Sequence, residues 1–206
     1  MAKKCITYRS SAEMPSEALL SLVETYTRLF SEAPWNEAWT PERVIEKLKH
    51  ELSSPLAFLT LLTEDETGIV GGFCWGASIP VAAIPQMVKE ARGQGTISVH
   101  EQHLNRIPKL IRASRILYID ELAIVREFRG GIAPVAALCL PFLTRADAQN
   151  LGVICWSTEE SNIVPILRAY GFKTVAEVGP LQFFWASRRA VRQLKQIAKE
   201  LSSKLS

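Results

Sequence analysis

The sequence predicts an α/β fold in which helices cover both faces of a mixed sheet. The expected elements follow the order βααββ, insertion, βαβαββα, so a hairpin comes early and strands alternate with helices later. In addition, a β-branched apolar run over 116–125 ends in the basic turn Arg129-Gly130-Gly131, directly before a helical pattern. A strand, a glycine-rich turn and a helix in this order are typical of a backbone that binds phosphate groups.

The composition is that of one globular domain spanning residues 1–206, with 48% hydrophobic and 22% charged residues. A net charge of +3 is too small to indicate nucleic-acid binding by itself. No apolar run approaches the roughly 18 residues that span a bilayer, and the basic N-terminus lacks the apolar stretch of an export signal. We therefore expect a cytoplasmic protein. The four cysteines are scattered without metal-ligand spacing, so we expect free thiols and no metal.

The first half of the chain predicts a strand, two helices and a hairpin. The strand covers residues 4–10, and apolar residues at helical spacing place a helix over 15–30. Thr40 is suited to the N-cap and Pro41 to the first turn of a second helix, which runs to about Leu52. Two apolar strands, 56–63 and 68–79, then flank a turn and form the antiparallel hairpin.

Residues 80–115 are more polar and contain several prolines and glycines, which indicates an insertion of two short helices joined by a loop. A central strand over 116–125 follows, and then a helix over 131–149 that Pro141 should bend or end early. The remaining predicted elements are a strand, a short helix, a strand pair and a basic C-terminal helix, at 153–158, 162–170, 172–178 with 181–186, and 187–205.

Three segments resemble the GCN5-related N-acetyltransferase (GNAT) superfamily. The phosphate-turn motif of that family is matched by Ile124, Phe128, Arg129-Gly130 and Gly131-Ile132-Ala133. Asn162, followed by Leu167, Tyr170 and Gly171-Phe172, is similar to the Asn…Leu-Tyr…Gly-Phe ending of the family, and residues 30–42 are similar to the loop between its first two helices. The resemblance implies a mixed, mostly antiparallel sheet of six to seven strands and transfer of an acetyl group from acetyl-coenzyme A to an amine.

The resemblance also implies a set of cofactor contacts. The N–H groups of residues 129–133 would receive the pyrophosphate at the helix N-terminus, with charge-assisted contacts from Arg129 and Arg126. The pantetheine arm would bond to the backbone of the preceding strand. The expected cofactor-binding residues are therefore Leu122, Ala123, Ile124, Arg126, Phe128, Arg129, Gly130, Gly131, Ile132, Ala133 and Asn162.

Two departures from the family pattern leave alternatives open. Gly130 is followed directly by Gly131, where the family has a spacer, and Arg126 replaces a proline. Either the loop closes more tightly, or Phe128 takes the place of the basic residue and the register shifts. Leu167 falls where the family often has a tyrosine that protonates the departing thiolate, and Tyr170 lies three residues later.

An amine acceptor is protonated at neutral pH, so a group must remove a proton. Asp120 and Glu121 are the candidates, and as neighbours on a strand they should face opposite sides of the sheet, so at most one can serve. The alternative is that one is solvated and the other pairs with an arginine. Protonation of the thiolate could fall to Tyr170 or Tyr118, although a half-buried tyrosine with a satisfied hydroxyl is the more common role.

The acceptor site is expected near Trp35 and Trp39, where aromatic side chains of the inter-helix loop could wall a pocket or could equally cap the core. The favoured function is an acetyl-CoA-dependent N-acetyltransferase acting on a small molecule or a protein. The alternative is a non-catalytic acyl-CoA-binding sensor or interaction module of the same fold. Binding of nucleic acid through the basic last helix is a weaker alternative, and a homodimer is possible.

Overall fold

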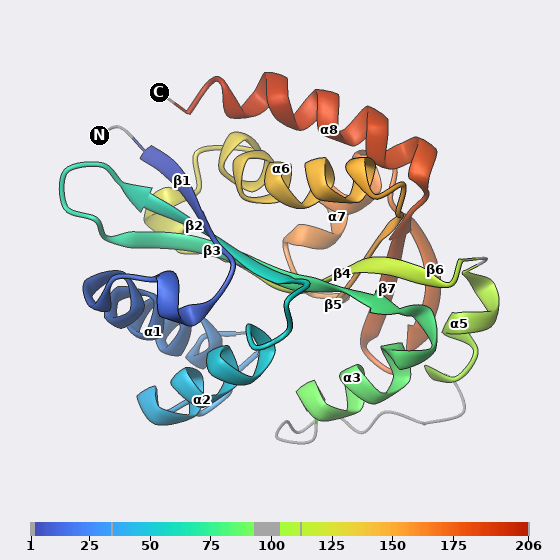
Figure 1. The fold of residues 1–206 in the computed structure, drawn as a ribbon, viewed down its shortest axis with the longest axis horizontal. Helices are drawn as coiled ribbons and strands as arrows, with labels where there is room; N and C mark the ends of the chain where they lie inside the picture. Colours follow the sequence, from blue (N-terminus) through green and yellow to red (C-terminus); the bar gives the residue numbers. More distant parts are fainter. Residues whose placement is uncertain (1–2, 34, 93–103, 112, 206) are drawn as a thin grey trace.

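A computed structural model of the chain describes residues 3–33, 35–92, 104–111 and 113–205. Seven strands form one mixed sheet in the order β1-β2-β3-β4-β5-β7-β6 (Figure 1). Neighbouring strands are antiparallel except β4 and β5, which are parallel. The mixed, mostly antiparallel sheet expected from the sequence is therefore confirmed.

The strands of the sheet are β1 (Lys3–Tyr8), β2 (Ala57–Glu64), β3 (Val70–Pro80), β4 (Arg115–Ile124), β5 (Val153–Thr158), β6 (Lys173–Val178) and β7 (Leu181–Ala186). The α-helices are α1 (Ser16–Ser31), α2 (Pro41–Glu51), α3 (Ile84–Arg92), α5 (Ile107–Leu110), α6 (Ala133–Ala148), α7 (Ile163–Ala169) and α8 (Arg188–Ser202). The short 3₁₀ helices are η1 (Ser11–Glu13), η2 (Val81–Ala83) and η3 (Arg126–Phe128). The predicted insertion contains η2, α3 and α5, and the loop expected between its two helices lies largely outside the described residues.

Helices cover both faces of the sheet, as predicted, and each face has its own apolar core. One core joins α1, α2 and α3 to the sheet, and its largest fully buried side chains include Tyr26, Phe73 and Trp75. The other lies under α6, α7 and α8, where Phe58 stacks on Phe142 with ring centroids 4.0 Å apart. Figure 1 shows α6 and α8 on one side of the sheet and α1 and α2 on the other.

Of the two outcomes predicted for Pro141, a bend or an early end of the helix, the early end is wrong. Helix α6 continues through Pro141 to Ala148 as one assigned element. One side of α6 packs on the sheet and the other side packs against α8. Asp147 near its C-terminus pairs with Lys195 and, at 3.3 Å, with Arg192. This packing supports the helix where the proline removes a backbone N–H.

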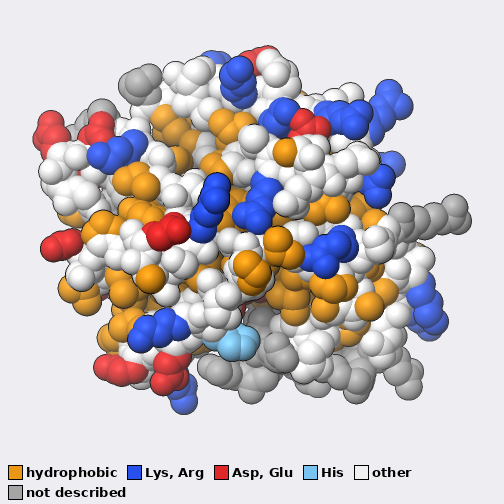
Figure 2. Space-filling model, viewed as in Figure 1, with side chains coloured by type: hydrophobic (Ala, Val, Ile, Leu, Met, Phe, Trp, Pro, Cys, Tyr) orange, Lys and Arg blue, Asp and Glu red, His pale blue; other side chains and the backbone are white. Residues whose placement is uncertain are grey.

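Helix α8 buries an apolar side and exposes a basic one. Val191, Leu194 and Ala198 are buried against the α6 core. The space-filling view shows Lys and Arg side chains gathered over the part of the surface where α8 lies (Figure 2). In the described part of the chain, no helix is both long enough and apolar enough to cross a membrane.

Candidate functional site

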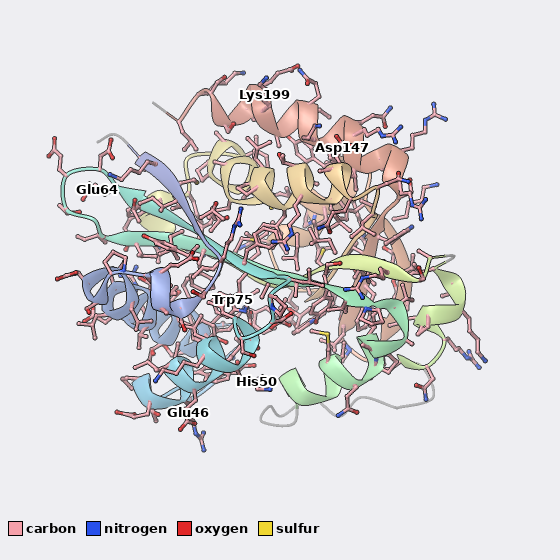
Figure 3. All side chains as sticks on the ribbon, in the orientation of Figure 1. Glu46, His50, Glu64, Trp75, Asp147 and Lys199 are labelled. Atoms are coloured by element: carbon pink, nitrogen blue, oxygen red, sulfur yellow. The ribbon has the colours of Figure 1, made fainter. Side chains whose placement is uncertain are left out.

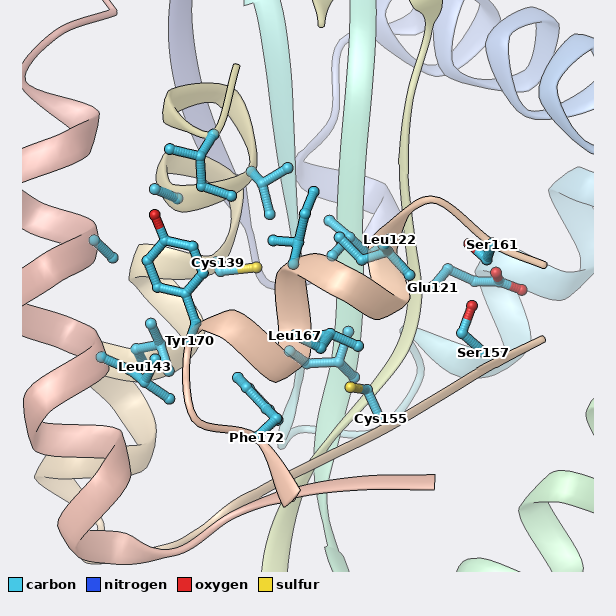
Figure 4. A pocket seen from close by; sticks show the side chains of 18 of the residues that line it. Glu121, Leu122, Cys139, Leu143, Cys155, Ser157, Ser161, Leu167, Tyr170 and Phe172 are labelled. Carbon is cyan, nitrogen blue, oxygen red and sulfur yellow. The ribbon is translucent and has the colours of Figure 1, made fainter. Parts of the chain in front are cut away.

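The parallel strands β4 and β5 separate soon after they meet. Their register contains two pairs, Leu117 with Val153 and Tyr118 with Ile154, and beyond these the described pairing between them stops. An apolar cleft opens at this point and continues between α6 and α7 to α8 (Figure 4). The β-strand part is lined by Ile119, Asp120, Glu121, Leu122, Cys155, Trp156 and Ser157, and the helical part by residues that include Val135, Cys139, Leu143, Ile166, Leu167, Leu194 and Leu201.

The glycine-rich turn connects β4 to α6 beside this cleft. Gly131 has a φ of +77°, which favours glycine, and a Cβ at Gly130 or Gly131 would meet nothing within 4 Å. Among the described backbone hydrogen bonds, none uses the N–H groups of Gly131, Ile132 or Ala133. The start of α6 therefore offers donors and open space, which suit an anionic group.

Phe128 is packed against the sheet. A Cβ on Gly71 would lie 2.0 Å from Phe128 Cδ1, so the phenyl ring fills the space over Gly71. Lys3 Nζ lies 5.0 Å from the centre of the same ring. The Arg129 Nε donates to the Ile124 carbonyl oxygen at 2.9 Å. The turn thus combines an aromatic anchor with an exposed arginine that is bonded to the end of β4.

The expectation that Asp120 and Glu121 face opposite sides of the sheet is wrong. Trp75 pairs with Glu121 and Gly76 pairs with Ile119, so Asp120 is the extra residue of a β-bulge. A Cβ on Gly76 would lie 2.0 Å from the Tyr118 carbonyl oxygen, which shows how closely β3 and β4 approach there. Because the bulge interrupts the alternation of side chains, both carboxylates reach the same partner on α2.

That partner is Lys47. Its Nζ lies 3.3 Å from Asp120 Oδ2 and 3.4 Å from Glu121 Oε1, and it also contacts Glu51 one turn along α2. Burial lowers the pKa of Lys47, but the surrounding carboxylates outweigh it and raise this pKa above its usual value. We call these four side chains the lysine–carboxylate cluster.

A second cavity lies on the α2 side of this cluster. Its lining includes Trp39, Glu51, Trp75, Tyr118 and Asp120, and Asp120 lines the apolar cleft as well. Asp120 is thus at the junction of the two spaces. Figure 3 shows Glu46 and His50 on α2, which also line the second cavity, and Trp75 on the neighbouring strand.

The two tryptophans predicted for the acceptor site lie on different cavities. Trp35 lines the apolar cleft, with its ring centroid 6.1 Å from that of Trp156. Trp39 lines the second cavity, donates to Glu37 at 2.7 Å and packs edge-on against Tyr26. Both are partly buried against the core, so the structure combines the two roles that the sequence left open.

The candidate tyrosines line different cavities, Tyr170 the apolar cleft and Tyr118 the second cavity. Tyr170 lies beside Cys139 and Leu143, at the opposite end from Glu121 (Figure 4). The Tyr118 hydroxyl accepts from Trp156 Nε1 at 2.5 Å. Burial and the negative charge of Asp120 raise the pKa of Tyr118 well above its usual value, so it stays a protonated donor.

The predicted cofactor contacts are distributed around the cleft. Leu122 and Ile132 line it, whereas Ala123 and Ile124 continue β4 toward the turn. Arg126 starts η3 with an exposed side chain. Asn162 precedes α7, is exposed and makes no side-chain capping bond.

Lys47 and Glu51 were not predicted as site residues, although the sequence contains a signal for them. On the helix 41–51, Lys47 and Glu51 lie at helical spacing on the same face as Val44 and Leu48, and both of these apolar side chains are fully buried. Charged residues at core-facing positions need partners. Two of the partners of Lys47 lie on β4, where Asp120 is 73 residues away in the sequence, and helical periodicity does not identify them.

Several solved structures resemble this one. NAA60 from Arabidopsis thaliana, solved with a bisubstrate analogue, is 12% identical, with a TM-score of 0.56 over 88% of this chain and 97% of that one. The PaiA N-acetyltransferase from Thermoplasma acidophilum, solved with coenzyme A, is 10% identical, with a TM-score of 0.56 over 91% and 99%. BjaI, a CoA-dependent acyl-homoserine lactone synthase solved with isopentyl-CoA, is 13% identical, with a TM-score of 0.56 over 96% and 89%.

No protein-family model matches the sequence, and no curated protein matches it. The structural likeness extends over about nine-tenths of the chain, and it identifies the fold as that of the GNAT acetyltransferases. The resemblance seen in the sequence motifs is thereby confirmed at the level of the fold. In the described residues, no group of three or more His, Cys, Asp or Glu side chains is arranged to hold a metal ion.

Proposed function

We propose that the protein is an acetyl-CoA-dependent N-acetyltransferase whose acceptor is an amine of a small molecule or a protein. The observation that supports this most strongly is the position of Asp120. This carboxylate lies where the cleft between β4 and β5 meets the second cavity, so it can contact both a thioester in the cleft and an amine in the cavity. The proteins of similar fold named above were solved with coenzyme A, an acyl-CoA or a bisubstrate analogue.

The proposed binding mode uses the turn and the cleft together. The free N–H groups of Gly131, Ile132 and Ala133 would bind the pyrophosphate, with Arg129 and Arg126 nearby. The backbone of residues 122–124 would bind the pantetheine arm, and Ala136, Cys139 and Ile166 offer it apolar contacts. Acetyl-CoA supplies a thioester carbonyl when it is bound. Phe128 would contribute by holding the turn against the sheet, and the exposed Asn162 would contribute from the segment before α7.

In the proposed mechanism, Asp120 accepts the proton of the acceptor ammonium and the free amine attacks the thioester directly. Glu121, which accepts from the Tyr26 hydroxyl at 3.1 Å and contacts Lys47, would hold the bulge in place. Collapse of the tetrahedral intermediate would expel the coenzyme A thiolate, and the second proton lost by the attacking nitrogen would pass to this thiolate. Tyr118, which lines the second cavity together with Asp120, is the candidate tyrosine beside the base. Tyr170 would contact the cofactor arm at the other end of the cleft.

The test is release of coenzyme A thiol from acetyl-CoA over a broad panel of amines. We expect turnover by the wild type, and Asp120→Asn should lower kcat by about 10²- to 10⁴-fold because it removes the base. Glu127→Gln, on the exposed η3, is the matched control and should keep the activity. Binding of acetyl-CoA without thiol release from any amine would favour the sensor, and an active Asp120→Asn would refute the assigned base.

A further inference from the structure

The apolar cleft passes through the sheet at the gap between β4 and β5. Its lining includes side chains from both cores. Leu143 and Leu167 belong to the core under α6, α7 and α8. Phe30 belongs to the core under α1 and α2, and Trp35 and Trp156 pack against that core. The cleft therefore extends from one face of the sheet to the other.

Trp156 lies at the point where the two strands separate. Asp120 and Trp156 are each two residues beyond the last pair that joins β4 to β5, Tyr118 with Ile154. Side chains alternate between the faces of a strand, and both Ile154 and Trp156 face the α1 side. The Trp156 indole Nε1 donates to the Tyr118 hydroxyl, which fixes the orientation of the indole ring. An acyl group whose thioester lies beside Asp120 would therefore lie across the gap from Trp156.

Three aromatic rings are in contact at this place. The ring centroid of Trp35 lies 6.1 Å from that of Trp156 and 5.6 Å from that of Phe30. All three rings line the apolar cleft, and we call them the aromatic wall. The second cavity has different aromatic side chains in its described lining, among them Trp39 and Trp75. The aromatic side chains of the two spaces are thus separate sets, one on each side of the carboxylate at their junction.

The aromatic wall offers more apolar surface than an acetyl group can cover. An acetyl group ends in a single methyl group, whereas one aromatic side chain presents roughly 150–250 Å² of surface. Trp35 and Trp156 are only partly buried by the protein, so part of each ring is left to contact a ligand in the cleft. Each further methylene group of an acyl chain would gain free energy by leaving water for such a surface.

We propose that the aromatic wall binds the acyl chain of acyl-CoA, and that the protein prefers acyl groups longer than acetyl. This inference rests on the proposed function, because it places the thioester beside Asp120. Since the wall lines the cleft and the acceptor is assigned to the second cavity, the acyl chain is its occupant. The transfer step is unchanged: the acceptor nitrogen forms the amide bond, the carbon–sulfur bond breaks, and a proton of the nitrogen passes to the thiolate.

The test is calorimetric titration with acetyl-, butanoyl- and hexanoyl-CoA in the absence of an acceptor amine. The affinity of the wild type should rise about fourfold for each added methylene group, or about 16-fold from acetyl- to butanoyl-CoA, until the chain outgrows the wall. In Trp35→Ala this gain should fall below about fourfold, because a large part of the wall is removed. Trp39→Ala is the matched control from the same loop, and it should keep the wild-type gain because Trp39 lines the second cavity.

The outcomes separate the inference from the proposed function. Equal affinities of the wild type for the three thioesters would overturn the chain preference alone, whether or not the variants fold. A wild-type gain that Trp35→Ala retains would also overturn it, because the chain would then lie elsewhere in the cleft. If Trp35→Ala does not fold, Trp35→Leu keeps an apolar side chain there and should still lose part of the gain. If none of the three thioesters binds, the proposed function itself is wrong.

Discussion

Asp120 is the extra residue of the bulge in β4, and this bulge places two carboxyl groups at the candidate site. The bulge between the Trp75 and Gly76 pairings turns both Asp120 and Glu121 toward Lys47. The sequence identified both acids and the apolar run that contains them. It could not identify the bulge, because strand periodicity assumes an uninterrupted ladder and the bulge depends on the close approach of Gly76 to Tyr118.

The raised pKa of Glu51 has a consequence for stability. The native protein binds the Glu51 proton more tightly than the unfolded chain, so this group makes the free energy of unfolding fall as pH rises above 4.5 toward the native pKa. Urea unfolding between pH 4 and 8 should show that Glu51→Gln gains stability relative to the wild type as pH rises across this window. An unchanged or opposite trend would show that Glu51 is ionised in the native state.

Gly131 can be tested against a glycine of the same backbone conformation. Gly131 and Gly68 have φ values of +77° and +68°, and a Cβ at either would meet nothing within 4 Å. Replacement of either by alanine should cost about 1 kcal/mol of stability through backbone strain. Only Gly131→Ala should also weaken acetyl-CoA binding, by at least about tenfold, as measured by calorimetry. Equal affinities of the two variants for acetyl-CoA would show that the turn at Gly131 is not part of the binding site.

At the scale of elements, α2 matters because it carries Lys47 and Glu51 to the sheet. Its beginning was predictable, since Thr40 and Pro41 form a standard helix start, and the Arg43 N–H does donate to Thr40 Oγ1 at 3.4 Å. The continuity of α6 through Pro141 was not predictable, because it depends on packing against the sheet and α8 rather than on local sequence. Local sequence signals therefore predicted where α2 begins but not that α6 continues through a proline.

The cap of α2 gives a prediction for the element. Thr40→Ala should lower the free energy of unfolding by about 1 kcal/mol, because the Arg43 N–H loses its acceptor. Thr40→Ser keeps the oxygen and should retain most of the stability, as measured by urea denaturation. Equal losses in both variants would mean that the threonine methyl group, and not the cap, is responsible.

At the scale of the whole molecule, the order of elements and the phosphate-turn motif were sufficient to predict the fold. The order of elements predicts helices on both faces of the sheet and a turn directly before α6, as observed. The apolar cleft could not be predicted from the sequence, because residues of β4, β5, α6, α7 and α8 line it together. Helix α8 was expected as a basic helix, but the sequence did not indicate that Leu194, Ile197, Ala198 and Leu201 line the cleft. Contacts between distant segments are set by tertiary packing and have no local signature.

We expect the cleft between β4 and β5 to bind acetyl-CoA, and isothermal titration calorimetry of the wild-type protein with acetyl-CoA tests this. Binding should be saturable, with one acetyl-CoA per chain, and the affinity should fall as salt is added because the turn and its arginines contact phosphates. The absence of binding heat at millimolar acetyl-CoA, at several temperatures, would contradict it.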